Sequence, residues 1–561
     1  MISSSSPFLQ DGFRVGRTDT WRFGLFNRRL RFCKASIKEP EKKQNKAIST
    51  TPEDRNAAAG TLISTSNAAL QDRTAPLVSA LKASAQQNAA GFHFPGHNRG
   101  QAAPPLLAEL IGIGAFAHDL PELPELDNLF SPNGVILDAQ KLAAELFRSS
   151  ETWFLVGGTT CGVQAAIMAT CSPGETLILP RNSHISAISA MVLSGAVPKY
   201  IIPQYNPRWD IASGITSSQV ERAIDELKSE GRVPTAVLVT SPTYNGICSN
   251  VSEIAQLCHS HSIPIIVDEA HGAHFRFHHQ MPNTALDQGA DIVIQSTHKV
   301  LCSLTQSSML HISGDIVDRE RIRQCLQTLQ STSPSYLLLA SLDATRAHLS
   351  KDPDTIFDEP MELAAEAVRH IKTVPGISLM TLQDFPNFPA IDPLRITVGV
   401  WELGLSGYEA DGILCKGPAV IAELAGGRSL TFAVSLGTCR QHIQRLVSGL
   451  DHLSATFLQK NGSGGRREGV KDSGCAPFAD ISMEMSPREA FFARKRSVKI
   501  EECIGEVCGE FICTYPPGIP VLIPGEIITE RALSYLLDAR NKGAEISGAA
   551  DPQISTVVVC K

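Results

Sequence analysis

The sequence predicts an α/β fold whose larger part is a mainly parallel sheet and whose C-terminal part is a smaller α+β domain. Short apolar runs alternate with helix-like segments between about residues 68 and 345, which is the pattern of parallel strands joined by helices. The chain has 561 residues, enough for two or three domains of ordinary size. A Gly-rich, charged stretch at residues 460–473 separates the last part from the rest.

The predicted elements follow one another in chain order. Residues 75–83 are amphipathic with helical spacing. Buried strands are expected at 153–156, 176–179, 236–239, 263–267 and 291–294. A helix is expected after the turn GGTTCG and another from about His184. A helix at 361–372 and a strand near 394–400 come next, and short strands and helices should pair from residue 486 onward.

These elements divide the chain into five parts. We expect a leader and linker at 1–60, a major domain at 61–375, a small connecting domain at 376–459, a flexible loop at 460–475 and a C-terminal domain at 476–561. The leader is rich in serine and arginine and poor in acidic residues, a composition typical of an organelle transit peptide. A plastid is favoured over a mitochondrion, and the alternative is a disordered basic tail on a cytoplasmic protein.

Composition limits the classes of function. The formal net charge is −7, and this mild acidity argues against the basic surface that nucleic-acid binding requires. No run of the sequence approaches the roughly 18 apolar residues of a membrane helix. The 14 cysteines are scattered without a CxxC pair, which indicates free thiols in a reducing compartment.

Lys299 and Asp268 are the first candidates for chemistry. Lys299 follows the apolar run ADIVI, and Asp268 ends the apolar run IPIIV. The carboxyl ends of parallel strands meet at one edge of a sheet, where ligands bind in open α/β folds. A lysine amine in a desolvated site can form a Schiff base, and a carboxylate there can hold a pyridinium nitrogen protonated.

Two further strand ends supply the remaining parts of a site. The turn GGTTCG (157–162) opens a helix, and its backbone N–H groups, with the hydroxyls of Thr159 and Thr160, form a cradle for a phosphate. The segment PRNSH places His184 where its ring can stack on an aromatic face. Each signal is weak alone, but the four together predict a site for a phosphorylated aromatic cofactor.

The chain resembles the fold-type-I Orn/Lys/Arg decarboxylases, and is most similar to their smaller bacterial-type members, here in a plastid version. The matching stretches, spread over residues 92–346, include FPGHNRG, HDLPELPELDNLFSPNG, VGGTTCGVQAAIMA, SPTYNGICSN, DEAHGAHF, QSTHK and STSPSY. SPREAFF and YPPGIPVLIPGE resemble the C-terminal domain of that family. The resemblance implies pyridoxal 5′-phosphate (PLP) as cofactor and decarboxylation of a basic amino acid as the reaction, in polyamine-type metabolism.

The resemblance also implies a role for each matching residue. Lys299 would form the internal Schiff base, Asp268 would pair with the pyridine nitrogen and His184 would stack on the ring. The implied phosphate contacts are Thr159, Thr160, Ser296 and His298. Ala270 and His271 would pack near the cofactor.

Two more residues are implied to act at the substrate end of the site. Thr332, in STSPSY, would reach the site of the neighbouring subunit, so a homodimer or larger homo-oligomer is expected. Glu526, in PGE, would meet the distal cation of the substrate or close the pocket. No metal is expected in the site. The expected substrate is arginine, in preference to lysine or ornithine, because smaller members of the family often take arginine.

The chain departs from the family pattern at four positions. Gly157 replaces the usual asparagine of the phosphate turn, and Cys161 replaces a third hydroxyl. Asn98 and Ile185 each replace a lysine, and the loss of two positive charges near the pocket can alter substrate preference. The proton donor to Cα is left open among His184, His271, Lys299 and a cysteine.

Other interpretations stay open beside the decarboxylase. His271, His274 and His278 recur at helical spacing, as in a metal site, but no clear carboxylate ligand accompanies them. GGTTCG lacks the spacing of either nucleotide loop, GxGxxG or GK[ST]. An aminotransferase or aldolase of the same fold is the nearest alternative. A non-catalytic PLP-binding regulator is another alternative. Loss of Lys299 or Asp268 would favour it, but both residues are present.

Overall fold

The computed structural model of the chain describes residues 75–87, 89–462, 476–515 and 518–561, all within one compact unit. The expected leader at 1–60 and most of the expected loop at 460–475 lie outside the described residues. Helix α15 (Arg440–Gly462) continues three residues into that expected loop.

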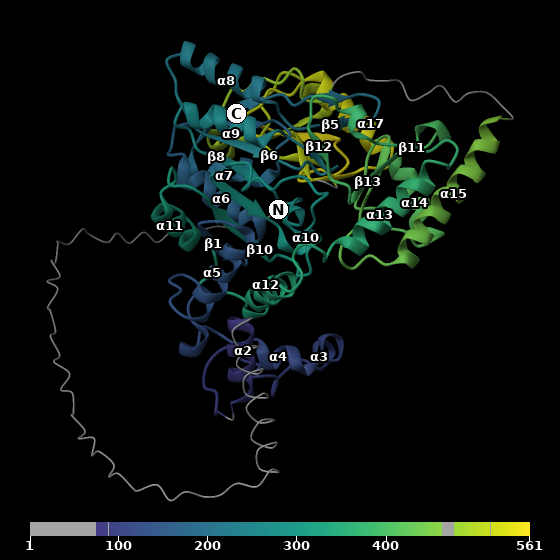
Figure 1. Ribbon diagram of the computed structural model, residues 1–561. Helices are drawn as coiled ribbons and strands as arrows, with labels where there is room; N and C mark the ends of the chain where they lie inside the picture. Colours follow the sequence, from purple (N-terminus) through teal and green to yellow (C-terminus); the bar gives the residue numbers. More distant parts are fainter. Residues whose placement is uncertain (1–74, 88, 463–475, 516–517) are drawn as a thin grey trace, which may run out of the picture. The chain divides into compact units, whose positions relative to one another are not determined.

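A seven-stranded sheet forms the centre of the major domain (Figure 1). Its strand order is β1-β10-β9-β8-β6-β2-β3, and every strand except β10 runs in the same direction. The strands are β1 Glu151–Leu155, β2 Thr176–Pro180, β3 Val197–Ile201, β6 Pro234–Thr240, β8 Ile265–Asp268, β9 Ile292–Gln295 and β10 Ser308–Ile312. The predicted α/β fold with a mainly parallel sheet is therefore confirmed, whereas the sequence does not predict the antiparallel strand β10.

Helices cover both faces of this sheet, because successive side chains of a strand point to opposite faces. Val237 and Val239 of β6 face a core closed by α2 (Pro76–Gln86), α5 (Val135–Phe147), α8 (Ser217–Ser229), α9 (Val251–Ser260) and α12 (Tyr336–Leu349). Ala236 and Leu238 face a second core closed by α6 (Gly158–Thr170), α7 (Ile185–Ser194) and α11 (Arg319–Leu329). A strand buried on both faces explains why the strand runs of the sequence are continuously apolar.

A four-stranded antiparallel sheet follows the major domain in the sequence. It has the order β11-β13-β15-β14, formed by β11 Ser378–Leu379, β13 Arg395–Gly399, β14 Leu424–Ala425 and β15 Ser429–Ala433. Helices α13 (Asp358–Ile371), α14 (Gly407–Lys416) and α15 pack with it. The shorter elements of the chain so far are α3 Pro105–Ile111, α4 Ile113–His118, β4 Tyr205–Asn206, β5 Ile211–Ala212, β7 Ile247–Cys248, α10 Thr297–Val300 and β12 Ala390–Ile391.

The C-terminal part has a small hydrophobic core of its own. Its elements are α16 Pro487–Phe492, β16 Lys495–Lys499, β17 Ile512–Tyr515, β18 Ile519–Leu522, α17 Glu530–Asn541, β19 Glu545–Ser547 and β20 Thr556–Cys560. Strands β16 and β20 pair, and β17 lies between β18 and β19. Ile512, Leu522 and Leu536 belong to the core that these elements enclose.

A buried ion pair joins the C-terminal part to the major domain. Arg181, the first residue after β2, is completely buried, and its Nε and Nη2 donate to the two carboxylate oxygens of Glu526 at 2.6 and 2.7 Å. Its remaining N–H groups donate to the carbonyl oxygens of Pro520 and Val521, at 2.8 and 3.2 Å. Paired, planar contacts of this kind fix geometry as well as charge.

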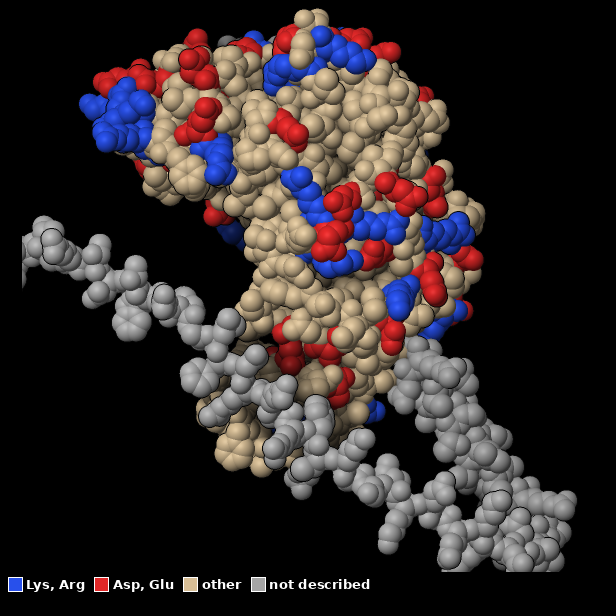
Figure 2. Space-filling model, turned by 90° about the vertical axis from the view of Figure 1, so that its left-hand side faces the viewer, with Lys and Arg blue, Asp and Glu red and all other residues tan. Residues whose placement is uncertain are grey.

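Surface charge and thiols agree with the composition of the chain. Acidic and basic side chains are interspersed on the face drawn in Figure 2. The twelve cysteines within the described ranges are all free thiols, as expected. Within these ranges, the structure has no helix that is both long and apolar enough to cross a membrane.

We expect Glu526→Ala to lower the free energy of unfolding by about 3–5 kcal/mol, because it leaves the Arg181 guanidinium buried without a counter-charge. Chemical denaturation of the purified protein measures this change. The control is Glu506→Ala, which removes a partly exposed ion pair with Arg496 and should cost at most about 1 kcal/mol. Equal losses in the two variants would contradict the prediction.

Candidate functional site

The predicted site residues meet at one edge of the seven-stranded sheet. Strands β1, β2, β6, β8 and β9 run in the same direction, so their carboxyl ends share this edge. Asp268 ends β8, and neighbouring β9 leads through Ser296 into α10, which carries Lys299. The end of β2 leads to His184, the residue that caps the N-terminus of α7.

The end of β1 leads into a group of hydroxyls at the N-terminus of α6. Thr159, in the first turn of this thirteen-residue helix, contacts the hydroxyl of Ser296 and lies 3.1 Å from that of Ser308. Thr160 beside it is exposed. The hydroxyls and the positive end of the helix dipole form a site suited to an anion.

Two other residues considered for the cradle have contacts of their own. His298 is half-buried, and its Nδ1 lies 2.9 Å from the carbonyl oxygen of Ser307. Cys161 lies in the hydrophobic core, where burial raises the pKa of its thiol to about 12. It therefore does not replace the expected third hydroxyl. A Cβ at Gly157 would lie 2.9 Å from the Cβ of Cys161, so the glycine leaves room for the cysteine.

Asp268, His184 and Ala270 form the middle of the site. The Asp268 carboxylate is buried and accepts a hydrogen bond from the Ala270 N–H at 3.2 Å. His184 Nδ1 lies 2.9 Å from the Ser186 hydroxyl. Burial lowers the pKa of His184, Asp268 acts to raise it, and Lys299 acts to lower it. The charges of Asp268 and Lys299 therefore act on the pKa of His184 in opposite directions.

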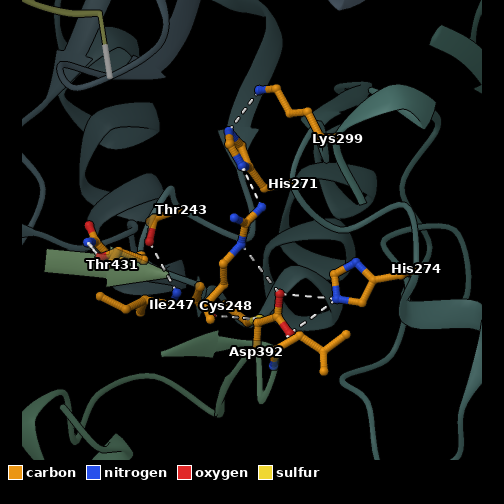
Figure 3. Close-up of polar contacts among 12 residues, drawn as sticks. Thr243, Ile247, Cys248, His271, His274, Lys299, Asp392 and Thr431 are labelled. Atoms are coloured by element: carbon orange, nitrogen blue, oxygen red, sulfur yellow. Dashed lines mark hydrogen bonds and ion pairs between the residues drawn. The ribbon is translucent and has the colours of Figure 1, made fainter. Parts of the chain in front are cut away.

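Lys299 lies at the end of a chain of polar contacts that reaches into the small sheet. Its Nζ lies 2.9 Å from Nε2 of His271, and Nδ1 of the same ring lies 3.0 Å from Nη2 of Arg395. Arg395 begins β13 and approaches Asp392, with Nε 3.9 Å from Oδ2. Figure 3 shows Lys299, His271, Asp392 and His274 along this chain of contacts.

The geometry of these contacts indicates which nitrogen atoms carry protons. A guanidinium can only donate, so Nδ1 of His271 must accept from Arg395. Burial, together with Lys299 and Arg395, lowers the pKa of His271 well below its ordinary value, so the ring is neutral and its single proton is on Nε2. That N–H can only donate to Lys299. In this tautomer the contact is a hydrogen bond when the lysine nitrogen is the uncharged acceptor.

The electrostatic surroundings of Lys299 favour the same state. Its side chain opens toward solvent, yet enough protein surrounds the amine for desolvation to lower its pKa. Asp268 and Glu423 oppose this shift, and Arg395 adds to it. An uncharged amine is the nucleophilic form of lysine.

The three histidines of the HGAHFRFH segment have different partners, which removes the basis for interpreting them as one metal site. His271 contacts Lys299 and Arg395, as described above. Nε2 of His274 lies 3.1 Å from Asp392, and Nε2 of His278 lies 3.3 Å from Asp358. Burial acts to raise the pKa of Asp392, but His274 and Arg395 outweigh burial and lower it.

Glu526, predicted to meet the substrate cation or to close the pocket, forms a buried ion pair in this structure. Its side chain is fully buried, and both carboxylate oxygens are held by Arg181. Because the oxygens are already paired with Arg181, the structure gives no support for a contact with the substrate cation, and the predicted role of Glu526 at the substrate end of the site stays a prediction. Thr332 is exposed, and its predicted contact with a second subunit stays a prediction.

Sequence reasoning missed Arg395 and Asp392, which orient His271. The segment LRITVGV indicates only a strand. The available signal is an arginine at the start of a run whose every residue is buried, since a charged residue there needs a partner. Tyr244, whose ring centre lies 4.8 Å from that of His271, was missed as well.

Comparison with known proteins identifies the relatives of this chain. Residues 75–399 match the family model of the Orn/Lys/Arg decarboxylase major domain, and residues 475–551 match that of the C-terminal domain. An arginine decarboxylase of Halalkalibacterium halodurans is 38% identical over 88% of this chain and 98% of its own length. One of Bacillus subtilis is 35% identical over 87% and 98%.

More distant relatives share the fold. A lysine decarboxylase of Hafnia alvei is 25% identical over 81% of this chain and 73% of its own length. The solved structure of the constitutive lysine decarboxylase of E. coli has a TM-score of 0.75 at 21% identity, and the match covers 91% of this chain and 85% of that one. The predicted family resemblance is confirmed.

We expect Arg395→Leu to raise the pKa of the Lys299 amine in cofactor-free protein. The change removes a nearby positive charge, and Nδ1 of His271 no longer has to accept a hydrogen bond from Arg395. The pH dependence of Lys299 acylation, followed by mass spectrometry of the peptide, measures this. Arg440→Leu, which removes an exposed arginine paired with Glu366, serves as control. Superimposable Lys299 profiles for wild type and Arg395→Leu would exclude the tautomer argument.

Proposed function

This chain belongs to the Orn/Lys/Arg decarboxylase family, and from that premise we propose that it converts arginine to agmatine and CO₂ with PLP. Decarboxylation of a basic amino acid is the activity that its relatives share by name. Arginine is proposed as substrate because relatives named arginine decarboxylase are 35–38% identical over nearly their whole length, against 23–25% for the lysine decarboxylases.

The single structural observation that carries the proposal is the contact of Lys299 with His271, beside the buried carboxylate of Asp268. The donor set around it fits PLP. The hydroxyls of Thr159 and Ser296 at the N-terminus of α6 suit its phosphate, and a carboxylate suits a protonated pyridine nitrogen. We assign Thr160 and His298 to the edge of the phosphate site, and His184, Ala270 and His271 to the surroundings of the ring.

When bound, PLP supplies an electron sink for the pair released as the carboxylate leaves. The chain's own residues prepare that step. Arg395 holds His271 in one tautomer, and His271 keeps the Lys299 amine uncharged and able to attack a carbonyl carbon. Asp268 would supply a fixed negative charge to a pyridine nitrogen, and His184 would stack on the ring.

We propose that Lys299, oriented by His271, delivers the proton to Cα of the substrate. Once Lys299 has taken up a proton as an ammonium, it would give that proton to Cα and return to the amine, held in place by the 2.9 Å contact of its Nζ with His271 Nε2. Among the alternatives, Cys161 and Cys248 are poor candidates, since burial raises the pKa of both thiols.

We expect the purified protein with PLP to release CO₂ and agmatine from arginine, faster than it forms cadaverine from lysine or putrescine from ornithine. Product identification by mass spectrometry after incubation with each amino acid tests this. Lys299→Ala should abolish turnover and the visible absorbance band of lysine-bound PLP. If Lys299→Ala lost turnover but kept the band, Lys299 would not be the residue that binds PLP as a Schiff base. Keto-acid or aldehyde products would favour an aminotransferase or an aldolase.

We also propose that the enzyme is at least a homodimer, with Thr332 at the neighbouring subunit's site, and that residues 1–60 direct it to a plastid. The serine- and arginine-rich composition of those residues supports the second proposal. Sedimentation of a fully active species at the mass of one chain would refute the first. A fluorescent fusion of residues 1–60 that stays outside plastids would refute the second.

A further inference from the structure

A cavity of about 130 Å³ lies beside the Lys299 site. The major domain, the small sheet and the C-terminal part all contribute to its wall, through residues such as Thr240, Ser429 and Val521. Tyr244, which also lines it, packs against His271. Thr240 is the β6 partner of Asp268. The cavity and the Lys299 site therefore share a wall.

The chemistry of this wall selects a positive charge. Of the described side chains that line the cavity, Asp210 alone is charged, and the others are apolar or uncharged polar groups. They include the tyrosines Tyr205, Tyr244, Tyr408 and Tyr535. A carboxylate among aromatic rings is a favourable environment for an organic cation.

Asp210 is only partly balanced by its surroundings. Its Oδ1 accepts a hydrogen bond from the Tyr205 hydroxyl at 2.6 Å. Burial raises the pKa of its carboxyl to about 6, against the opposing effects of Tyr205, Lys542 and Arg428, and Asp538 raises it further. The two cations are engaged elsewhere, because Lys542 pairs with Asp538 and Arg428 donates to the Arg208 carbonyl and stacks on Trp401.

Two further features indicate a ligand at this carboxylate. A Cβ at Gly427 would lie 2.7 Å from Oδ2 of Asp210, so the glycine leaves that oxygen open. The Thr240 hydroxyl is buried and has no hydrogen-bond partner in the described part of the chain. A buried hydroxyl without a partner is costly, and a ligand with N–H donors would satisfy it.

We propose that this cavity binds the cationic head of an organic amine or guanidine. The cavity is close in size to an engineered cavity of about 150 Å³ that holds benzene, so a guanidinium with a few methylene groups fits. The class of ligand rests on the proposed function, whose substrate and product both carry such a head. Two sources share this chemistry, namely the distal arm of the reacting amino acid and a separate molecule of amine product.

Calorimetric titration of the full-length, cofactor-free protein with agmatine tests the proposal. Asp210→Asn and Gly427→Ala should each weaken agmatine binding at least tenfold at pH 7.5. Asparagine suits position 210 because the backbone there is left-handed, with φ of 55°. The control is Gly412→Ala on α14, where an added Cβ meets nothing within 4 Å. Putrescine should bind, and its uncharged counterpart 1,4-butanediol should not.

The pH dependence gives a second readout. Wild-type affinity for agmatine should fall as the pH drops through about 6, because Asp210 takes up a proton and loses its charge. Asp210→Asn has no carboxyl at this position, so its weaker affinity should lack that step. Equal agmatine affinities for wild type, Asp210→Asn, Gly427→Ala and Gly412→Ala would overturn the proposal.

Kinetics of the PLP-loaded enzyme distinguish the two sources. A raised KM for arginine in Asp210→Asn, with a smaller change in kcat, supports the distal arm of the reacting molecule. An unchanged KM with loss of non-competitive inhibition by agmatine supports a separate product molecule. Absence of CO₂ release from every basic amino acid, with agmatine binding intact, would refute the proposed function and leave the cation site standing.

Discussion

An arginine side chain can only donate hydrogen bonds, and the chemistry of this site depends on that constraint. Arg395 makes Nδ1 of His271 an acceptor, which sends the ring proton to Nε2 and leaves the Lys299 nitrogen as the acceptor of the last bond. The surroundings of the lysine amine thereby depend on a residue of a different sheet, which also acts to lower the pKa of that amine. Asp392 and His274 hold Arg395 in place from the other side.

A second buried arginine has a mechanical role. Arg181 follows directly from the strand that leads to His184, and it binds a carboxylate and two carbonyl groups of the C-terminal part. The same short segment therefore positions His184 and fixes one wall of the neighbouring cavity. Burial of both charges makes this joint specific, because neither group can be left without the other.

The sequence was sufficient for five of the seven strands and for the residues at their carboxyl ends, because both depend on local patterns. Five apolar runs and the polar residues that end them predict where Asp268, Lys299, His184 and Thr159 lie. Contacts between distant segments were beyond such reasoning. Arg395 lies 124 residues from His271 in sequence, and nothing near it indicates its partner. The partner of Glu526 was missed for the same reason, since its motif does not reveal Arg181, 345 residues away.

The wall of the cavity is built partly from the C-terminal part, so substitutions in that part can change the cavity without changing the Lys299 site. The residues assigned to the cofactor lie on the major domain, after strands β1, β2, β8 and β9 at one edge of its sheet. The cavity also draws on Phe478, Thr514 and Val521 of the C-terminal part, which has its own core. Substitutions there can accumulate without disturbing the lysine or its hydrogen-bonded neighbours. The shape and charge of the cavity can therefore change in evolution while Lys299, His271 and Arg395 keep their contacts.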